Sequence, residues 1–316
     1  MKRTLWASLA IAALALPLAA QEAAPAPSPG EIVAAADPGD WIGIAADDLL
    51  VMDLAAGRDG QARRVVIQLM PEPFSQGWIE NIRTLARTRW YDGISVNRVQ
   101  DNYVTQWGDP NYDNPEAEGE AKPLPGGLMV VPQTEYTDLR TAGEATWFKW
   151  ADGPYANHHG FYSGWPIGWR ADAKWPVHCY GMVGVGRGMS PDTGSGAELY
   201  TVIGHAPRHL DRNIALVGRV IEGMEHLSSL PRGSGALGFY TPEEADKRTP
   251  IRSVRVASDL AEAEQPRFEY LATDSETFAR YAEARANRRD PFFIVPAGGA
   301  DICNIPVPVR RVGEAG

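Results

Sequence analysis

The sequence predicts a mainly β protein, a barrel with helical caps, and two observations carry this prediction. Short β-branched runs bounded by turn residues recur between about residues 48 and 257. Helical periodicity is confined to a few short stretches, so strands do not alternate with helices as βαβ units require. No internal repeat is visible in the chain.

The barrel pattern begins with a predicted hairpin, residues 48–54 and 64–69, around the turn signal at 57–60. Ser75 is placed to cap a helix, in which apolar residues recur at spacings of three and four: Trp78, Ile79, Ile82, Leu85 and Ala86. The turn Tyr91-Asp92-Gly93 then leads into a strand at 94–99. Later elements are expected as strands at 181–185, 198–203, 215–220 and 251–257 and a short helix at 223–229.

Two segments fall outside this pattern. Residues from about 110 to 176 are broken by Gly and Pro every few positions and indicate a long, partly ordered insertion. Its tryptophans favour a small aromatic core, with a carbohydrate or peptide platform as the alternative: Trp147, Trp150, Trp165, Trp169 and Trp175. Residues 259–316 form a C-terminal extension with one expected helix, from 275 to about 286.

The charge balance bears on the class of partner. The 316 residues carry 30 Lys and Arg against 40 Asp and Glu, a net charge of −10. Binding to a phosphate backbone needs clustered Lys and Arg, so a nucleic acid is not an expected partner. Hydrophobic residues make up 44% of the chain, which is typical of a globular protein rather than a disordered one.

The first 20 residues have the features of a cleavable export signal. Lys2 and Arg3 precede an apolar stretch at 5–18, and small residues at 18–20 form a cleavage site. The apolar stretch is shorter than the roughly 20 residues of a membrane span, although an uncleaved anchor is the alternative. We therefore expect a periplasmic or secreted protein without a stable membrane anchor, with a flexible, Ala- and Pro-rich leader at 21–40.

The expected export bears on the state of the two cysteines, Cys179 and Cys303. An oxidising compartment favours a disulfide between them, while two unpaired buried thiols are the alternative, since sequence does not show whether they approach. Their spacing excludes a zinc ribbon. His158-His159 and His178 lack the spacing of a metal site, and the glycines at 184–188 do not follow the GxGxxG pattern of a dinucleotide loop.

Four collinear stretches resemble the cyclophilin family of peptidyl-prolyl isomerases, at residues 65–71, 80–86, 91–110 and 210–224. Residues 181–187, ahead of Pro191, look like the family's strand before its second active-site loop. The resemblance implies a closed eight-stranded antiparallel barrel capped by two helices over residues 41–258, with the site on its outer face. A barrel of that size is filled by its own side chains, which agrees with an external site.

The resemblance also assigns the first half of a site. Arg98 in Val96-Asn97-Arg98 matches the family's catalytic arginine, and Gln106 matches the glutamine that binds substrate backbone and steadies it. Tyr103 and Val104 match the pair that floors the proline pocket. Without the flanking match, Arg98 would be read as a surface arginine and the apolar pair as ordinary barrel packing.

The second half departs further from the family pattern. Glu198 and Tyr200 best match a glutamine and a pocket phenylalanine, although a shift of one residue would place Leu199 in the pocket instead. Glu198 could pair with Arg98 or favour basic peptides. The remaining substrate-binding residues implied by the resemblance are Gly186, Arg187, His209, Leu210 and Ile214.

The implied activity is rotation about Xaa-Pro bonds in exported proteins, with unfolded, proline-containing chains as partners. Amide rotation breaks no covalent bond, so no metal or cofactor is expected. The alternative is a catalytically weak cyclophilin fold that binds proline-containing segments or partner proteins, with the insertion and extension as its interaction surface. An unrelated exported enzyme whose site lies in the insertion is a third reading.

Overall fold

Eight antiparallel strands close into a barrel in the computed structural model, which describes residues 25–57, 59–112, 114–138, 148–170 and 173–313. The order around the barrel is β10-β11-β5-β4-β13-β2-β3-β12. The strands are β2 (Leu49–Leu54), β3 (Arg63–Leu69), β4 (Ser95–Val99), β5 (Val104–Gly108), β10 (Met182–Val185), β11 (Leu199–Val202), β12 (Leu216–Glu222) and β13 (Thr249–Val256). The predicted fold class and the β2–β3 hairpin are confirmed.

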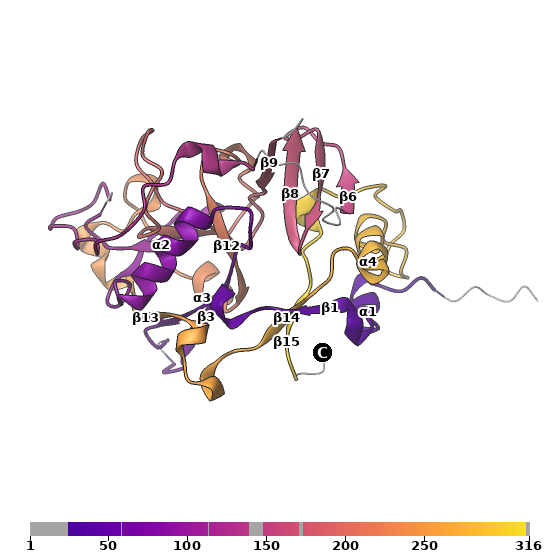
Figure 1. Ribbon diagram of the computed structural model, residues 1–316, viewed down its shortest axis with the longest axis horizontal. Helices are drawn as coiled ribbons and strands as arrows, with labels where there is room; N and C mark the ends of the chain where they lie inside the picture. Colours follow the sequence, from indigo (N-terminus) through magenta and orange to yellow (C-terminus); the bar gives the residue numbers. More distant parts are fainter. Residues whose placement is uncertain (1–24, 58, 113, 139–147, 171–172, 314–316) are drawn as a thin grey trace, which may run out of the picture.

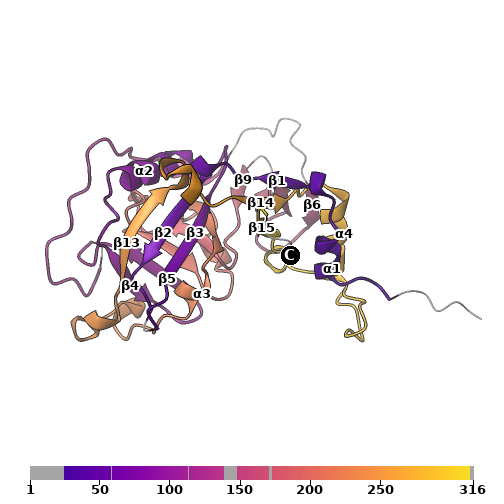
Figure 2. The same ribbon diagram turned by 90° about the horizontal axis from the view of Figure 1, so that it is seen from below.

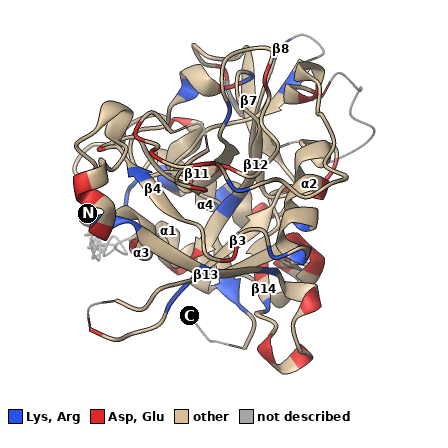
Figure 3. Ribbon diagram, turned by 90° about the vertical axis from the view of Figure 1, so that its left-hand side faces the viewer, with Lys and Arg blue, Asp and Glu red and all other residues tan. Residues whose placement is uncertain are grey.

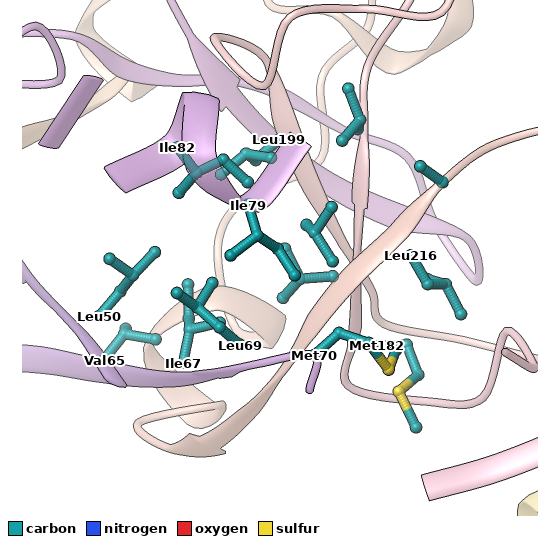
Figure 4. Packing of buried hydrophobic residues seen from close by; sticks show 14 of the residues in the cluster. Leu50, Val65, Ile67, Leu69, Met70, Ile79, Ile82, Met182, Leu199 and Leu216 are labelled. Carbon is teal, nitrogen blue, oxygen red and sulfur yellow. The ribbon is translucent and has the colours of Figure 1, made fainter. Parts of the chain in front are cut away.

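The barrel interior is filled by alternate strand residues and by one face of α2 (Gln76–Arg87). Figure 4 shows Ile79 and Ile82 of α2 directed at strand residues such as Leu199. These three side chains are at most 2% exposed. Because the interior is closed by its own side chains, a ligand has to bind on the outside.

Two helix starts differ from the prediction. Ser75 precedes α2, but its φ of 58° is left-handed and its side chain makes no capping hydrogen bond, so the buried apolar face of α2 stabilises the helix instead. Helix α3 (Glu225–Ser228) begins later than expected, after Gly223 with a φ of 82°.

Short 3-10 helices connect many elements: η1 (Pro38–Asp40), η2 (Ala46–Asp48), η3 (Gln133–Tyr136), η4 (Arg208–Leu210), η5 (Ala236–Gly238), η6 (Pro242–Lys247), η7 (Ala257–Asp259), η8 (Glu262–Glu264) and η9 (Ile302–Asn304).

A second lobe lies beside the barrel and is built from three separate parts of the chain (Figures 1 and 2). One sheet has the order β1-β14-β15, so its strands come from both ends of the described chain, and the other, β6-β7-β8-β9, comes from the insertion. The elements of this lobe are α1 (Pro29–Ala34), β1 (Trp41–Gly43), β6 (Phe148–Ala151), β7 (His158–Tyr162), β8 (Trp165–Arg170), β9 (Ala173–Pro176), β14 (Phe268–Leu271), α4 (Glu276–Ala286) and β15 (Val309–Arg311).

Direct contacts hold these three parts together. The rings of Phe161 on β7 and Phe278 on α4 meet edge to face, with centroids 4.9 Å apart. The indole N–H of Trp150 donates to the Ala300 carbonyl at 2.8 Å. Cys179 and Cys303 form a disulfide, with Cα atoms 5.1 Å apart, which ties the barrel side of the chain to the extension.

The second lobe corrects the prediction of a flexible leader at 21–40. In its described part, Ser28 and Glu31 form a reciprocal capping box at the start of α1, and Ile32 is buried against the core of the lobe. The leader is therefore structured from about residue 28 onward. The predicted signal peptide, residues 1–20, lies outside the described residues.

The described part of the insertion contains a four-stranded sheet, β6-β7-β8-β9. Trp165 and Trp175 are each 1% exposed. Trp165 belongs to the same buried cluster as the barrel residues, so the insertion shares that core instead of forming the small aromatic core favoured from the sequence. Trp150 and Trp169 are partly exposed, and Trp147 lies outside the described residues. The helix expected at 275–286 is present as α4, where the Ser275 side chain accepts the Phe278 N–H.

Candidate active site

A cavity of about 730 Å³ opens on the outer face of the barrel, between strands β4, β5 and β11 and the loops that follow β10 and α3. Most of the predicted site residues reach it. Its lining residues are Arg98, Tyr103, Val104, Gln106, Asn111, Asn114, Pro115, Gly186, Arg187, Gly188, Met189, Tyr200, Leu210, Ile214, Leu237 and Phe239.

Arg98, on β4, is held in place on several sides. Its Nε donates to the Leu237 carbonyl at 2.7 Å, Nη1 donates to Gln106 Oε1 at 3.1 Å, and Nη2 donates to Gln100 Oε1. The guanidinium carbon lies 5.6 Å from the ring centre of Tyr103 and 5.4 Å from that of Phe239. Burial lowers the pKa of Arg98, but an arginine remains a cation in a protein.

Gln106, on β5, connects Arg98 to Glu198. Its Oε1 accepts from Arg98, and its Nε2 donates to Glu198 Oε2 at 3.4 Å. The amide orientation is fixed by this arrangement, since arginine only donates and a carboxylate only accepts. Gln106 therefore presents the guanidinium to the cavity while it separates the two charged groups.

The other half of the cavity is apolar. Val104, Tyr200 and Val202 form a buried cluster distinct from the barrel core, against which Tyr103, Leu210 and Ile214 pack. The pairing of β11 with β5 sets Tyr200 opposite Gln106 on the outer face. Leu199, one residue earlier, points into the barrel core. The register thus puts Tyr200, and not Leu199, in the pocket.

The loop after β10 forms the remaining wall. The N–H of Gly186 donates to the Glu198 carbonyl at 2.8 Å, which holds the loop against β11. Arg187 is turned onto the backbone, because its Nε and Nη2 donate to the Asn213 carbonyl and its Nη1 donates to the Gly188 carbonyl. Its backbone remains the part available to a peptide.

Two predicted substrate-binding residues lie elsewhere. Glu198 is 3% exposed, and its carboxylate packs over Gly108 behind Gln106, so it does not line the cavity. Burial also removes it as a surface charge for basic peptides. His209 stacks on Tyr103, with ring centroids 6.4 Å apart, and does not line the cavity.

The sequence analysis missed several lining residues. Leu237 and Phe239 belong to η5 and its end, a loop that pairs with Arg98 although about 140 residues separate them. Asn111, Asn114 and Pro115 lie at the start of the insertion. The motif Val96-Asn97-Arg98 identifies Arg98 in the sequence through the family resemblance. No local motif identifies the η5 loop that contacts Arg98.

No group of three or more His, Cys, Asp or Glu side chains within the described part of the chain could hold a metal ion. The histidines and cysteines considered above have other partners. His178 contacts Asp211 and Tyr200, His159 contacts Arg208, His158 contacts Asp152, and both cysteines form the disulfide. No helix of the described residues is long and apolar enough to cross a membrane.

Comparison with known proteins agrees with this fold. Residues 58–256 match the family model described as cyclophilin type peptidyl-prolyl cis-trans isomerase. The structure is similar to that of cyclophilin AquaCyp293 from Hirschia baltica, with a TM-score of 0.65 and 23% identity over 87% of this chain and 94% of that one. A Cryptosporidium parvum cyclophilin-type isomerase, crystallised in the presence of the dipeptide Ala-Pro, scores 0.36 at 11% identity over 65% of this chain and 98% of that one. No curated protein sequence matches.

The closed eight-stranded barrel, together with the family match over residues 58–256, defines the class of protein, a cyclophilin-type isomerase. The chain belongs to the cyclophilin-type peptidyl-prolyl cis-trans isomerase family. Members of this family catalyse rotation about the peptide bond that precedes proline.

Proposed function

We propose that this protein accelerates Xaa-Pro rotation in exported proteins and that Arg98 is its main catalytic residue. The observation that carries this proposal is the position of the Arg98 guanidinium, at the edge of an apolar pocket and fixed by three hydrogen bonds. A catalyst of this reaction needs both parts, since one holds the proline and the other acts on the amide.

The reaction has a barrier of about 18 to 20 kcal/mol because rotation breaks the amide resonance. In the twisted amide the nitrogen lone pair is localised, and a hydrogen-bond donor can stabilise it. Three of the five N–H groups of Arg98 have protein acceptors, so two are left for the substrate. A preorganised cation in a partly buried site stabilises the transition state more than water does.

The apolar half of the cavity would hold the proline ring. Val104, Leu210 and Ile214 offer carbon surface, and the Tyr200 ring closes the pocket between them. Holding the ring fixes one side of the amide bond, so that thermal motion of the other side leads directly to rotation. Gln106 is placed to bind the substrate backbone next to Arg98.

The export proposal rests on the signal-like residues 1–20 and is supported by the disulfide. Disulfides persist in the periplasm and outside the cell and are rare in the cytosol. Exported chains arrive unfolded, and prolyl isomerisation takes roughly tens of seconds, so it limits folding there. Unfolded, proline-containing chains are therefore the proposed partners.

A protease-coupled isomerisation assay on a panel of Xaa-Pro tetrapeptides tests the activity, together with NMR titration of the same peptides. Acceleration with saturable binding supports the isomerase. Binding to the pocket residues without acceleration would instead support the module that only binds proline-containing segments. Fractionation of cells that express the full chain tests export, since an uncleaved, cytoplasmic protein would contradict it.

A further inference from the structure

A buried chain of polar groups runs from the inserted sheet to the proline pocket. Arg208, in η4, donates from Nη2 to His159 Nε2 on β7 at 2.9 Å and from Nε to Asp211 Oδ2 at 2.8 Å. Asp211 Oδ1 contacts His178 Nδ1 at 2.9 Å, and His178 Nε2 contacts the Tyr200 hydroxyl at 2.9 Å. All five residues are at most 5% exposed.

The donors and acceptors of this chain follow from its two charged residues, Arg208 and Asp211. Arg208 only donates, so His159 Nε2 and Asp211 accept from it. Asp211 Oδ1 accepts the His178 backbone N–H at 3.0 Å. Because a carboxylate only accepts, it also accepts the proton on His178 Nδ1. His178 Nε2 is then an acceptor, and Tyr200 donates its hydroxyl proton to it.

The Tyr200 ring has little freedom within this arrangement. It lies across Gly184, where any side-chain carbon would overlap its hydroxyl end. It is also nearly parallel to the His178 ring, with an interplanar angle of 11°. Burial raises the pKa of Tyr200 well above 10, so the hydroxyl keeps the proton that it donates.

We propose that the chain His159–Arg208–Asp211–His178 positions Tyr200 in the proline pocket, so that the inserted sheet sets the affinity of the pocket for substrate. The proposal rests on the isomerase function above. While the chain is intact, the Tyr200 hydroxyl is directed at His178, and the pocket presents ring carbon to proline. When a link of the chain is lost, His178 is no longer held in position as the acceptor of the Tyr200 hydroxyl, and the ring shifts at the expense of the pocket.

Within this row of polar groups, Arg208 makes the contacts that join the two lobes. Besides His159, its guanidinium lies 4.8 Å from the ring centre of Tyr155 in the insertion and 3.8 Å from Asp301 of the extension. The pocket residue Tyr200 therefore depends on contacts from outside the barrel. His178, Asp211 and Arg208 act as positioning residues, since none of them lines the cavity.

The test compares two substitutions at His159 in the full chain. His159→Phe keeps a ring but removes the acceptor for Arg208, whereas His159→Gln keeps an acceptor. We expect the KM for Xaa-Pro peptides to rise at least about twofold in His159→Phe, a low value for a coupled hydrogen-bond network, with a smaller change in kcat. The His159→Gln variant should keep the wild-type KM. His158→Phe is the matched control, because the neighbouring His158 is only partly exposed and pairs with Asp152 instead of Arg208.

Tyr200→Phe makes the test specific, because it removes the hydroxyl and keeps the ring. If His159 acts through that hydroxyl, His159→Phe has no further effect on KM in the Tyr200→Phe background. An equal effect in both backgrounds, or an equal effect of His158→Phe, would overturn the proposal. The pH dependence of KM provides a second readout. His178 faces Asp211 and Tyr200 and lies near Arg208 and His209. Once it is protonated in acid, its Nε2 no longer accepts the Tyr200 hydroxyl. KM should therefore rise at acid pH in wild type and not in Tyr200→Phe.

A readout without activity separates this proposal from the isomerase proposal. The ¹⁵N chemical shifts of His178 at neutral pH should show a protonated Nδ1 and an unprotonated Nε2. The opposite tautomer would contradict the chain whether or not the protein is active. If the wild type accelerates no peptide, the same variants are compared by their Kd for a tetrapeptide that contains Ala-Pro. An unchanged Kd in a folded His159→Phe variant would overturn the proposal. Should His159→Phe not fold, His178→Gln and the tautomer measurement decide the question.

Discussion

The Leu237 carbonyl accepts a hydrogen bond of 2.7 Å from Arg98 Nε, although the two residues are 139 positions apart in the sequence. This contact makes the η5 loop part of the proposed catalytic site. Leu237 has a φ of 55° and the next residue, Gly238, has a φ of 83°, so the carbonyl reaches Arg98 through two left-handed residues. Loop geometry and arginine position are therefore linked.

Substitution of Gly238 by alanine should disturb this loop and lower kcat/KM. A Cβ atom at Gly238 would lie 2.9 Å from the Gln100 backbone, and the left-handed φ adds about 1 to 2 kcal/mol of strain. Gly298→Ala is the matched control, since Gly298 has a φ of 81° and open space around it. By urea unfolding, Gly298→Ala should lose only the stability that the left-handed φ costs, Gly238→Ala should lose more because of the clash, and only Gly238→Ala should lose activity. Equal activities would mean that the loop does not position Arg98.

Gln106→Ala should lower kcat/KM about tenfold, the effect of about 1.4 kcal/mol for a lost hydrogen bond to a charged group. Gln106 both fixes Arg98 Nη1 and lines the cavity. Gln100→Ala, which removes the Nη2 acceptor but does not touch the cavity, should have a smaller effect on KM. Steady-state kinetics of both variants check this, and a larger KM effect in Gln100→Ala would count against the assignment of Gln106 to substrate binding.

Removal of the disulfide should lower stability without direct damage to the site. The bridge spans 124 residues, so its loss releases about 4 to 5 kcal/mol of loop-closure entropy on the chain-entropy model. Urea unfolding of the Cys179→Ser, Cys303→Ser double variant measures this loss. Reduction of the wild type should give the same shift. A midpoint that stays unchanged would show that contacts between the lobes suffice.

Stability should fall in acid because of His178. Burial lowers the pKa of His178 from its ordinary value of 6.5, so the folded state binds its proton less readily than the unfolded state. This contribution is complete above pH 6.5 and is lost as the pH falls through the folded pKa, at a slope of up to about 1.4 kcal/mol per pH unit. His178→Gln removes this proton, so its free energy of unfolding should depend less on pH between neutral and mildly acid conditions. An identical pH dependence would contradict the assignment.

The barrel elements follow from local sequence patterns, and half of the site follows from the resemblance of the motifs around Arg98 and Gln106 to those of the family. The strands and α2 carry their own periodicity, and Arg98 and Gln106 sit in adjacent strands whose pairing brings them together. In Figure 3 acidic and basic segments are interspersed over the barrel lobe, so charge alone gives no position for the site.

The second lobe and the loop over Arg98 could not be predicted in the same way. The leader, the insertion and the extension each lack a core of their own, and Phe161 and Phe278 become buried only when the segments meet. Glu198 is predicted to bind substrate because its position matches a glutamine of the family, but the space above Gly108 lets its side chain turn inward. Such packing depends on contacts between distant residues rather than on local pattern.

The central claim is that Arg98 stabilises the twisted amide, and the most direct test is the kcat/KM of Arg98→Ala in the protease-coupled assay. Arg232→Ala serves as the control, because Arg232 is exposed, lies outside the cavity and pairs with Asp101. The account predicts that Arg98→Ala loses about a hundredfold or more of the activity, as removal of a transition-state donor does, while peptide binding persists. A folded Arg98→Ala variant with wild-type kcat/KM would contradict it.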